Sequence, residues 1–143
     1  MLPDTRTGAE HPRARADQSR AHEQGSAVVD FVLVGTLLTF LFLAIVQLTL
    51  VLHVRNTLID AASSGARYGT LADRTPDDAR QRTAELIGTA LNPGYAQDIS
   101  TSEAEVRGIR TLEVTVKAPL PVVGLFGLPV SVLEVKGHAA LPG

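Results

Sequence analysis

The residues whose types and spacing could support chemistry lie where a polar stretch meets an apolar one. Gly25 and Ser26 stand at this border, and Asp30 and Phe31 follow within two helical turns. A carboxylate inside an apolar stretch is costly in lipid, although a helix N-terminus favours a negative charge. Ser26 and Asp30 are four residues apart and share one helical face. Asp30 is therefore placed where it could pair with a cation at the start of the helix.

The rest of the chain offers no recognisable active site. Ser63-Ser64 lacks the strand-to-helix setting of an activated nucleophile, and Asp77 and Asp78 fit the first turn of a helix. The four histidines are scattered without metal-ligand spacing, at positions 11, 22, 53 and 138. We therefore expect no enzymatic activity, no metal, no cofactor and no small-molecule substrate.

Composition narrows the class of protein further. The chain has 143 residues, a formal charge of -2, no Trp, four Phe and two Tyr, so it carries neither the basic patch nor the aromatic platform of a nucleic-acid binder. It has no cysteine, which excludes disulfides and thiolate metal sites. At this length it forms at most one ordinary domain.

An apolar run from Phe31 to Leu52 predicts a transmembrane helix. Its 22 residues carry no charge, and as a helix they span about 33 Å against a hydrocarbon core of about 30 Å. The threonine hydroxyls inside the run can donate hydrogen bonds to carbonyls of the helix backbone. Gln47 is expected to face a partner helix. Two alternatives are a buried helix of a soluble protein and a cleaved signal peptide, although this run is longer than a signal peptide requires.

The helix is expected to position a small domain behind it. We divide the chain into a polar, disordered leader and cytoplasmic tail (1–25), the transmembrane helix (26–54), a helix extension (55–72) and an extracytoplasmic domain (73–143). Arg13, Arg15 and Arg20 outnumber Arg55 and Arg67 on the other flank, so the positive-inside rule favours a cytoplasmic N-terminus and a single-pass cell-membrane protein.

The pattern after residue 73 predicts the α+β class. Thr75-Pro76-Asp77-Asp78 marks the start of a second helix, and Asn92-Pro93-Gly94 marks its end. Residues 111–118 alternate between polar and apolar as a half-buried strand does, and 99–106 and 130–139 are weaker strand patterns. Arg107-Gly108 is expected to form a turn and 119–129 a loop. The expected fold is a long transmembrane helix that continues outside the membrane, a second helix and a small antiparallel sheet.

Two motifs around the apolar helix resemble a known family. The Gly25-Ser26 border, with Asp30-Phe31 after it, is similar to the cleavage site of type IV prepilins and closer still to the TadE-like pseudopilins of tight-adherence pilus systems. Downstream, Ala61–Tyr68 resembles the family's Ala-Ala-Arg-x-Gly-Ala-Arg-Tyr stretch, including Gly65, Ala66, Arg67 and Tyr68, with Ser63 in place of the first Arg. Asp30 stands where the family usually has Glu.

The resemblance implies a minor structural or assembly subunit of a Flp-type pilus or related secretion apparatus. A prepilin peptidase would cut between Gly25 and Ser26, where Gly supplies an extended, unhindered segment, and the helix would be retained. The cut creates an α-amine on Ser26 that Asp30 of a neighbouring subunit could bind, which would set register in a filament. The implied partners are the peptidase, other pilin-like subunits, pilus assembly proteins and membrane lipid.

Other interpretations of the same residues remain open. Gly25-Ser26 could be a loop and helix cap, and Asp30 an interfacial residue without a partner. Gly65, Arg67 and Tyr68 could simply pack the helix against the C-terminal domain. The alternative function is a signal-anchored envelope protein whose external domain binds a partner without any cleavage. A soluble domain secreted after signal removal is a third possibility.

Overall fold

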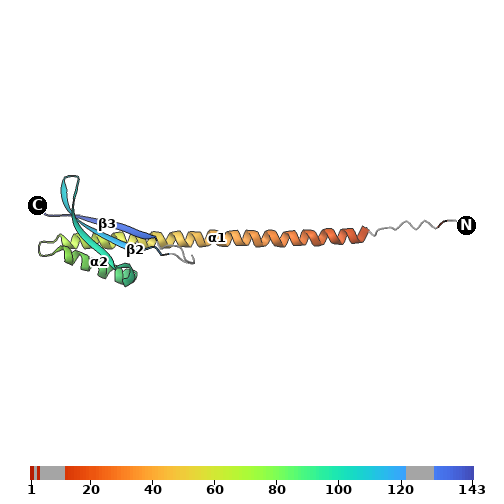
Figure 1. Ribbon diagram of the computed structural model, residues 1–143, viewed down its shortest axis with the longest axis horizontal. Helices are drawn as coiled ribbons and strands as arrows, with labels where there is room; N and C mark the ends of the chain where they lie inside the picture. Colours follow the sequence, from red (N-terminus) through yellow and green to blue (C-terminus); the bar gives the residue numbers. More distant parts are fainter. Residues whose placement is uncertain (2, 4–11, 122–130) are drawn as a thin grey trace. The chain divides into compact units, whose positions relative to one another are not determined.

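A computed structural model describes residues 1, 3, 12–121 and 131–143. It divides the chain into two units, Met1–Ala44 and Ile45–Gly143, which are described separately. The element order is α1 (Pro12–Gly69), α2 (Pro76–Ala90), a 3-10 helix η1 (Pro93–Tyr95), β1 (Asp98–Val106), β2 (Ile109–Pro119) and β3 (Val132–Ala140) (Figure 1). This confirms the α+β class, with a long N-terminal apolar helix, a second helix and a three-stranded antiparallel sheet.

Helix α1 begins earlier than its sequence suggested. The tail was expected to be disordered, but from Pro12 onward it is helical, so that prediction was wrong for this part. Between Pro12 and Gly25 there is no other proline or glycine. A helix already nucleated by the apolar run adds one hydrogen bond per residue as it extends, so such a segment joins it at little cost. Residues 4–11 of the expected tail lie outside the described residues.

Polar side chains within the apolar run bond mainly to the helix itself. The hydroxyls of Thr36 and Thr39 donate to the carbonyls of Val32 and Gly35, at 2.7 and 2.8 Å. This confirms the expectation for the threonines. The Gln47 amide donates to the Pro121 carbonyl of the same chain, and its contact with a partner helix stays a prediction.

Helix α2 starts as its sequence predicts. Thr75 is the N-cap, Pro76 follows at the first helical position, and Thr75 and Asp78 form a reciprocal capping box. The hydrogen bond from the Thr75 backbone N–H, at 2.8 Å, holds the pKa of Asp78 below its ordinary value. The helix ends at Ala90, just before the predicted stop at Asn92-Pro93-Gly94. Pro93–Tyr95 then form η1, which the Asn92 side chain caps.

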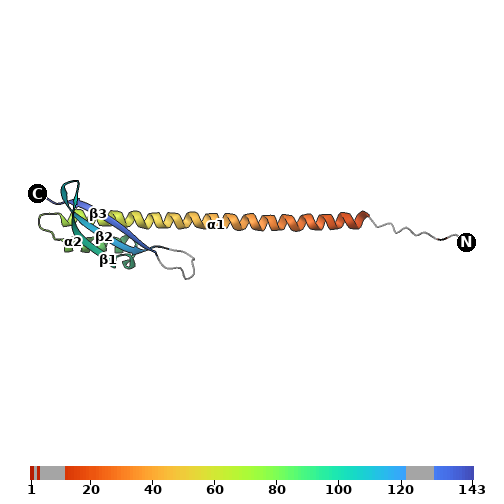
Figure 2. The ribbon, with the colours of Figure 1, turned by 45° about the horizontal axis from the view of Figure 1, so that its top comes forward.

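The three strands form a sheet in the order β1-β2-β3 (Figure 2). Arg107 and Gly108 make the predicted turn, with φ of 54° and 79°, which is the geometry that suits a tight hairpin. The strand expected at 130–139 is β3, Val132–Ala140. The loop was expected at residues 119–129. Pro119 is instead the last residue of β2, and Leu120 and Pro121 follow it. Residues 122–129 lie outside the described residues.

The core of the second unit lies between α1, α2 and one face of the sheet. From Leu112 onward strand β2 alternates, so that Leu112, Val114, Val116 and Ala118 are buried on this face. Leu58 is fully buried among them. Helix α1 contributes mostly small residues to this core, namely Ala61, Ala62 and Ala66. The C-terminal domain therefore packs against the small-residue side of the helix extension.

Candidate functional site

The polar–apolar border lies inside α1, in the first unit. Gly25, Ser26, Asp30 and Phe31 are all exposed, with Phe31 at 79%. A side chain built on Gly25 would meet no atom within 4 Å. The expectation of an extended segment at Gly25 was wrong, because the helix runs through it from Pro12. The cooperative extension of α1 explains this, and Gly25 remains a weak point since glycine destabilises a helix interior by about 1 kcal/mol.

The surface that follows this border is apolar on every side. Val28, Phe31, Leu37 and Phe40 are between 63% and 79% exposed, and the most apolar window of the helix is wholly unburied. Its length and composition are sufficient to cross a bilayer. A buried helix of a soluble protein would have these side chains covered by the domain. The helix therefore fits a single-pass membrane protein.

The second motif, Gly65 to Tyr68, lies at the contact between α1 and α2. A Cβ on Gly65 would overlap the Thr83 hydroxyl and stand 2.8 Å from the Ala79 carbonyl oxygen. Thr83 is fully buried and donates to that same carbonyl, at 2.8 Å. Ala66 is also fully buried in the core. In this geometry Gly65 and Ala66 let two helices approach closely.

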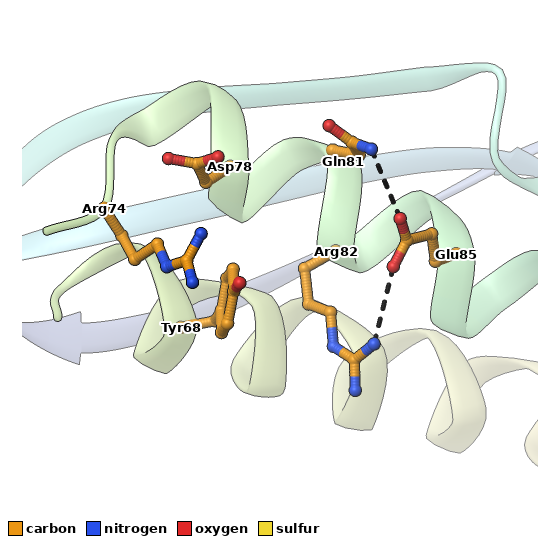
Figure 3. Close-up of a pocket in the computed structure, with 6 residues that line it drawn as sticks. All are labelled: Tyr68, Arg74, Asp78, Gln81, Arg82 and Glu85. Atoms are coloured by element: carbon orange, nitrogen blue, oxygen red, sulfur yellow. Dashed lines mark hydrogen bonds and ion pairs between the residues drawn. The ribbon is translucent and has the colours of Figure 1, made fainter.

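Tyr68 and Arg67 mark the end of α1. The guanidinium of Arg74 lies 4.8 Å from the centroid of the Tyr68 ring (Figure 3), a cation–π contact across the turn that joins α1 to α2. Arg67 is exposed, and its positive charge suits the C-terminal end of a helix. Its carbonyl accepts from the Thr70 hydroxyl at 2.9 Å. Both residues stabilise the helix end in this arrangement.

The pocket beside Tyr68 is lined by charges that already have partners. It is bounded by Tyr68, Arg74, Asp78, Gln81, Arg82 and Glu85 (Figure 3). Arg82 pairs with Glu85 at 3.4 Å, and Asp78 is held by the capping box. These contacts pair Arg82, Glu85 and Asp78 within α2 and its cap.

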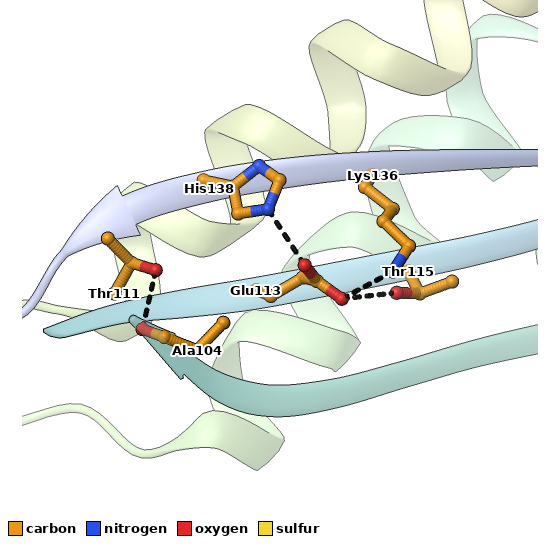
Figure 4. Close-up of polar contacts among 6 residues, drawn as sticks. All are labelled: Ala104, Thr111, Glu113, Thr115, Lys136 and His138. Carbon is orange, nitrogen blue, oxygen red and sulfur yellow. Dashed lines mark hydrogen bonds and ion pairs between the residues drawn. The ribbon is translucent and has the colours of Figure 1, made fainter. Parts of the chain in front are cut away.

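A polar cluster on the outer face of the sheet was not anticipated from the sequence. Glu113 accepts from Lys136 at 2.9 Å and lies 2.8 Å from Nε2 of His138, both on β3 (Figure 4). The hydrogen bond from Lys136 is the main reason why the pKa of Glu113 lies below its ordinary value, and Glu113 in turn raises the pKa of Lys136. Alternation along each strand places these side chains on the outer face of the sheet. Only the β2–β3 register, which pairs Glu113 with His138, brings them together.

The described residues contain no group of three or more His, Cys, Asp or Glu that could hold a metal ion. The contacts of Glu113 with Lys136 and His138 join β2 to β3 across the outer face of the sheet.

Comparison with known proteins adds one finding. The family model described as "TadE-like protein" matches residues 25–67. No curated protein and no solved structure matches the chain. The match begins at Gly25 and ends at Arg67, so it includes the polar–apolar border, the exposed apolar helix and most of the second motif. Residues 25–67 are thus similar to TadE-like proteins, which confirms the resemblance that the sequence motifs suggested.

Proposed function

We propose that this chain is a TadE-like pseudopilin, a minor structural or assembly subunit of a tight-adherence pilus or related secretion apparatus. The observation that carries the proposal is the apolar stretch of α1, exposed on every side, that follows the Gly25-Ser26 border and has a carboxylate, Asp30, four residues after Ser26. The family match, which begins at the same glycine, supports it. The N-terminus lies in the cytoplasm and the domain of residues 73–143 outside it, as the arginine distribution favours.

Processing is the first step of the proposed mechanism. A prepilin peptidase cuts the Gly25–Ser26 bond and leaves the apolar helix in the membrane. Because α1 is helical through this bond, the peptidase must unwind a local segment before the bond can enter an extended active site. Gly25 lowers the cost of that unwinding, since glycine is a poor helix former and its exposed position has no tertiary contact to break.

Assembly is the second step. The new α-amine on Ser26 lies at a helix N-terminus, one turn from Asp30 on the same face. Within lipid an unpaired carboxylate is costly, so Asp30 gains from a cation supplied by the Ser26 amine of a neighbouring subunit. The pairing sets the axial register of the two helices, while their exposed apolar side chains pack together or against lipid. This chain needs to supply no catalytic group for either step.

Sequencing of the mature N-terminus tests the proposal. The full chain is coexpressed with a prepilin peptidase, and membrane-extracted protein is expected to begin at Ser26. Gly25→Val should block the cut. Gly35→Val is a matched control, because Gly35 is also an exposed helical glycine with nothing within 4 Å of its Cβ position. A wild-type chain that still begins at residue 1 or 2 would favour the uncleaved envelope protein and refute the pseudopilin.

A further inference from the structure

One end of the sheet meets α1 close to the membrane-spanning stretch. At this end Pro119 of β2 pairs with Val132 of β3, and beyond the pair the Leu120 N–H donates to the Ser131 carbonyl at 3.1 Å. We name this the 119/132 end. The adjoining Pro121 carbonyl accepts a hydrogen bond from the Gln47 side chain of α1. The 119/132 end is therefore tied to a residue within the apolar run itself.

Helix α1 changes its surroundings at this same position. Ile45 and Val46 are exposed, at 55% and 43%. From Gln47 onward one side becomes covered, and Val54 is buried at 3%. The other side keeps exposed apolar side chains, with Leu48 at 60% and Leu52 at 46%. Over this turn and the next, the helix thus faces its own domain on one side and remains apolar and open on the other.

The length of the helix places this contact at the membrane surface. Ala27 to Val46 is 20 residues, which as an α-helix span about 30 Å, the thickness of the hydrocarbon core. If the membrane begins at Phe31 instead, its outer edge falls near Leu50. In both cases Gln47 lies at or inside the outer edge, and so does the Pro121 carbonyl bonded to it.

The chemistry of the 119/132 end suits that level. The Val132 side chain is 64% exposed although it is apolar. The sequence carries no charged residue between Lys117 and Glu134. The charged outer face of the sheet begins two residues beyond this end, with the paired Lys117 and Glu134. An uncharged, partly apolar surface beside a lipid-exposed helix can enter the headgroup region without desolvating a charge.

We propose that the 119/132 end of the sheet rests in the outer headgroup region of the lipid bilayer, as a second membrane contact beside α1. This inference rests on the membrane anchoring contained in the proposed function. Lipid is the occupant because Pro121, beside this end, is bonded to Gln47, which lies within the apolar run of α1. The Gln47–Pro121 hydrogen bond ties the end to the helix at this depth, and it also satisfies a polar group that would otherwise be costly there.

Single-cysteine labelling tests the contact, because the chain has no cysteine of its own. Full-length Val132→Cys is labelled with an environment-sensitive fluorophore and placed in phosphatidylcholine vesicles that contain a lipid-bound quencher near the headgroups. Ile109→Cys is the matched control, a similarly exposed apolar strand residue (55%) paired with Val106 at the opposite end of β2. Leu37→Cys reports the membrane span itself.

The expected result is a blue-shifted emission and strong lipid quenching for the label at 132, with neither at 109, and strong shielding from aqueous quencher at 37. Equal, water-like signals at 132 and 109 with a shielded label at 37 would overturn this inference and leave the membrane anchoring intact. A water-exposed label at 37 would overturn both. Quenching at 132 that disappears as the protein is diluted in lipid would mean that a second copy covers this end, which also contradicts the proposal.

Discussion

Replacement of Gly65 by alanine gives a quantitative test of the α1–α2 contact. The added Cβ would overlap the Thr83 hydroxyl and lie 2.8 Å from the Ala79 carbonyl oxygen and 3.1 Å from the Thr83 Cβ. A flexible side chain could move aside, but the Ala79 carbonyl, near the start of α2, cannot do so without shifting the helix. Overpacking of this kind costs about 1–3 kcal/mol.

Two further terms bear on the magnitude. Displacement of Thr83 breaks a buried hydrogen bond to Ala79, which adds about 1 kcal/mol or more to the cost. Alanine in place of glycine improves helix propensity by about 1 kcal/mol. We therefore expect Gly65→Ala to lower the free energy of unfolding of the second unit by about 1–3 kcal/mol, or roughly 4–8 °C in melting temperature for each kcal/mol.

The assay is thermal unfolding of the full chain in detergent, followed by circular dichroism and by hydrogen exchange of the β2 amides. Gly88→Ala is the matched control, because Gly88 is a helical glycine on α2 with nothing within 4 Å of its Cβ position. That variant should gain about 0.5–1 kcal/mol. Thr83→Ala in the Gly65→Ala background should restore part of the loss. A Gly65→Ala chain as stable as Gly88→Ala would refute the close-packing role.

Three further predictions concern the rest of the second unit. Gly137→Ala should lower the free energy of unfolding by about 1–3 kcal/mol or more. The added Cβ would stand 2.7 Å from the Ala62 carbonyl oxygen and still closer to other backbone atoms of α1. An unchanged melting temperature would contradict the contact of β3 with α1. Thr75→Ala should cost about 1 kcal/mol by removing the capping box, and Thr75→Ser should restore most of it. The pKa of Glu113 is lowered in the folded state, chiefly by the Lys136 hydrogen bond. The ionised carboxylate therefore stabilises the fold above its unfolded pKa, and this stabilisation is lost as the pH falls through the folded pKa. The melting temperature of Glu113→Gln should depend less on pH between 3 and 7 than that of wild type.

Much of the fold could be predicted because its signals are local. The apolar run from Phe31 to Leu52, the capping signal at Thr75 and the alternation of 111–118 each depend on residues close in sequence. The Arg107-Gly108 turn is equally local. The same reasoning failed at the leader, where helix cooperativity carried α1 back to Pro12 through residues that lack an apolar pattern of their own.

The contacts between distant segments could not be predicted in the same way. The closeness of Gly65 to Thr83, and of Gly137 to α1, depends on how separate elements approach each other. The Glu113 cluster requires the β2–β3 register, and the Gln47 hydrogen bond requires the position of Pro121. The motif from Gly65 to Tyr68 was correctly singled out, but its geometry shows helix packing, whereas the roles of Gly25, Ser26, Asp30 and Phe31 in processing and assembly stay predictions.

The intact mass of the protein extracted from the membranes of cells that contain a prepilin peptidase tests the central claim most directly. The account predicts a membrane-bound chain that lacks residues 1–25 and retains residues 31–52. A membrane-bound chain that keeps its leader would contradict the processed pseudopilin. A chain found in the soluble fraction without residues 31–52 would contradict the membrane anchor as well.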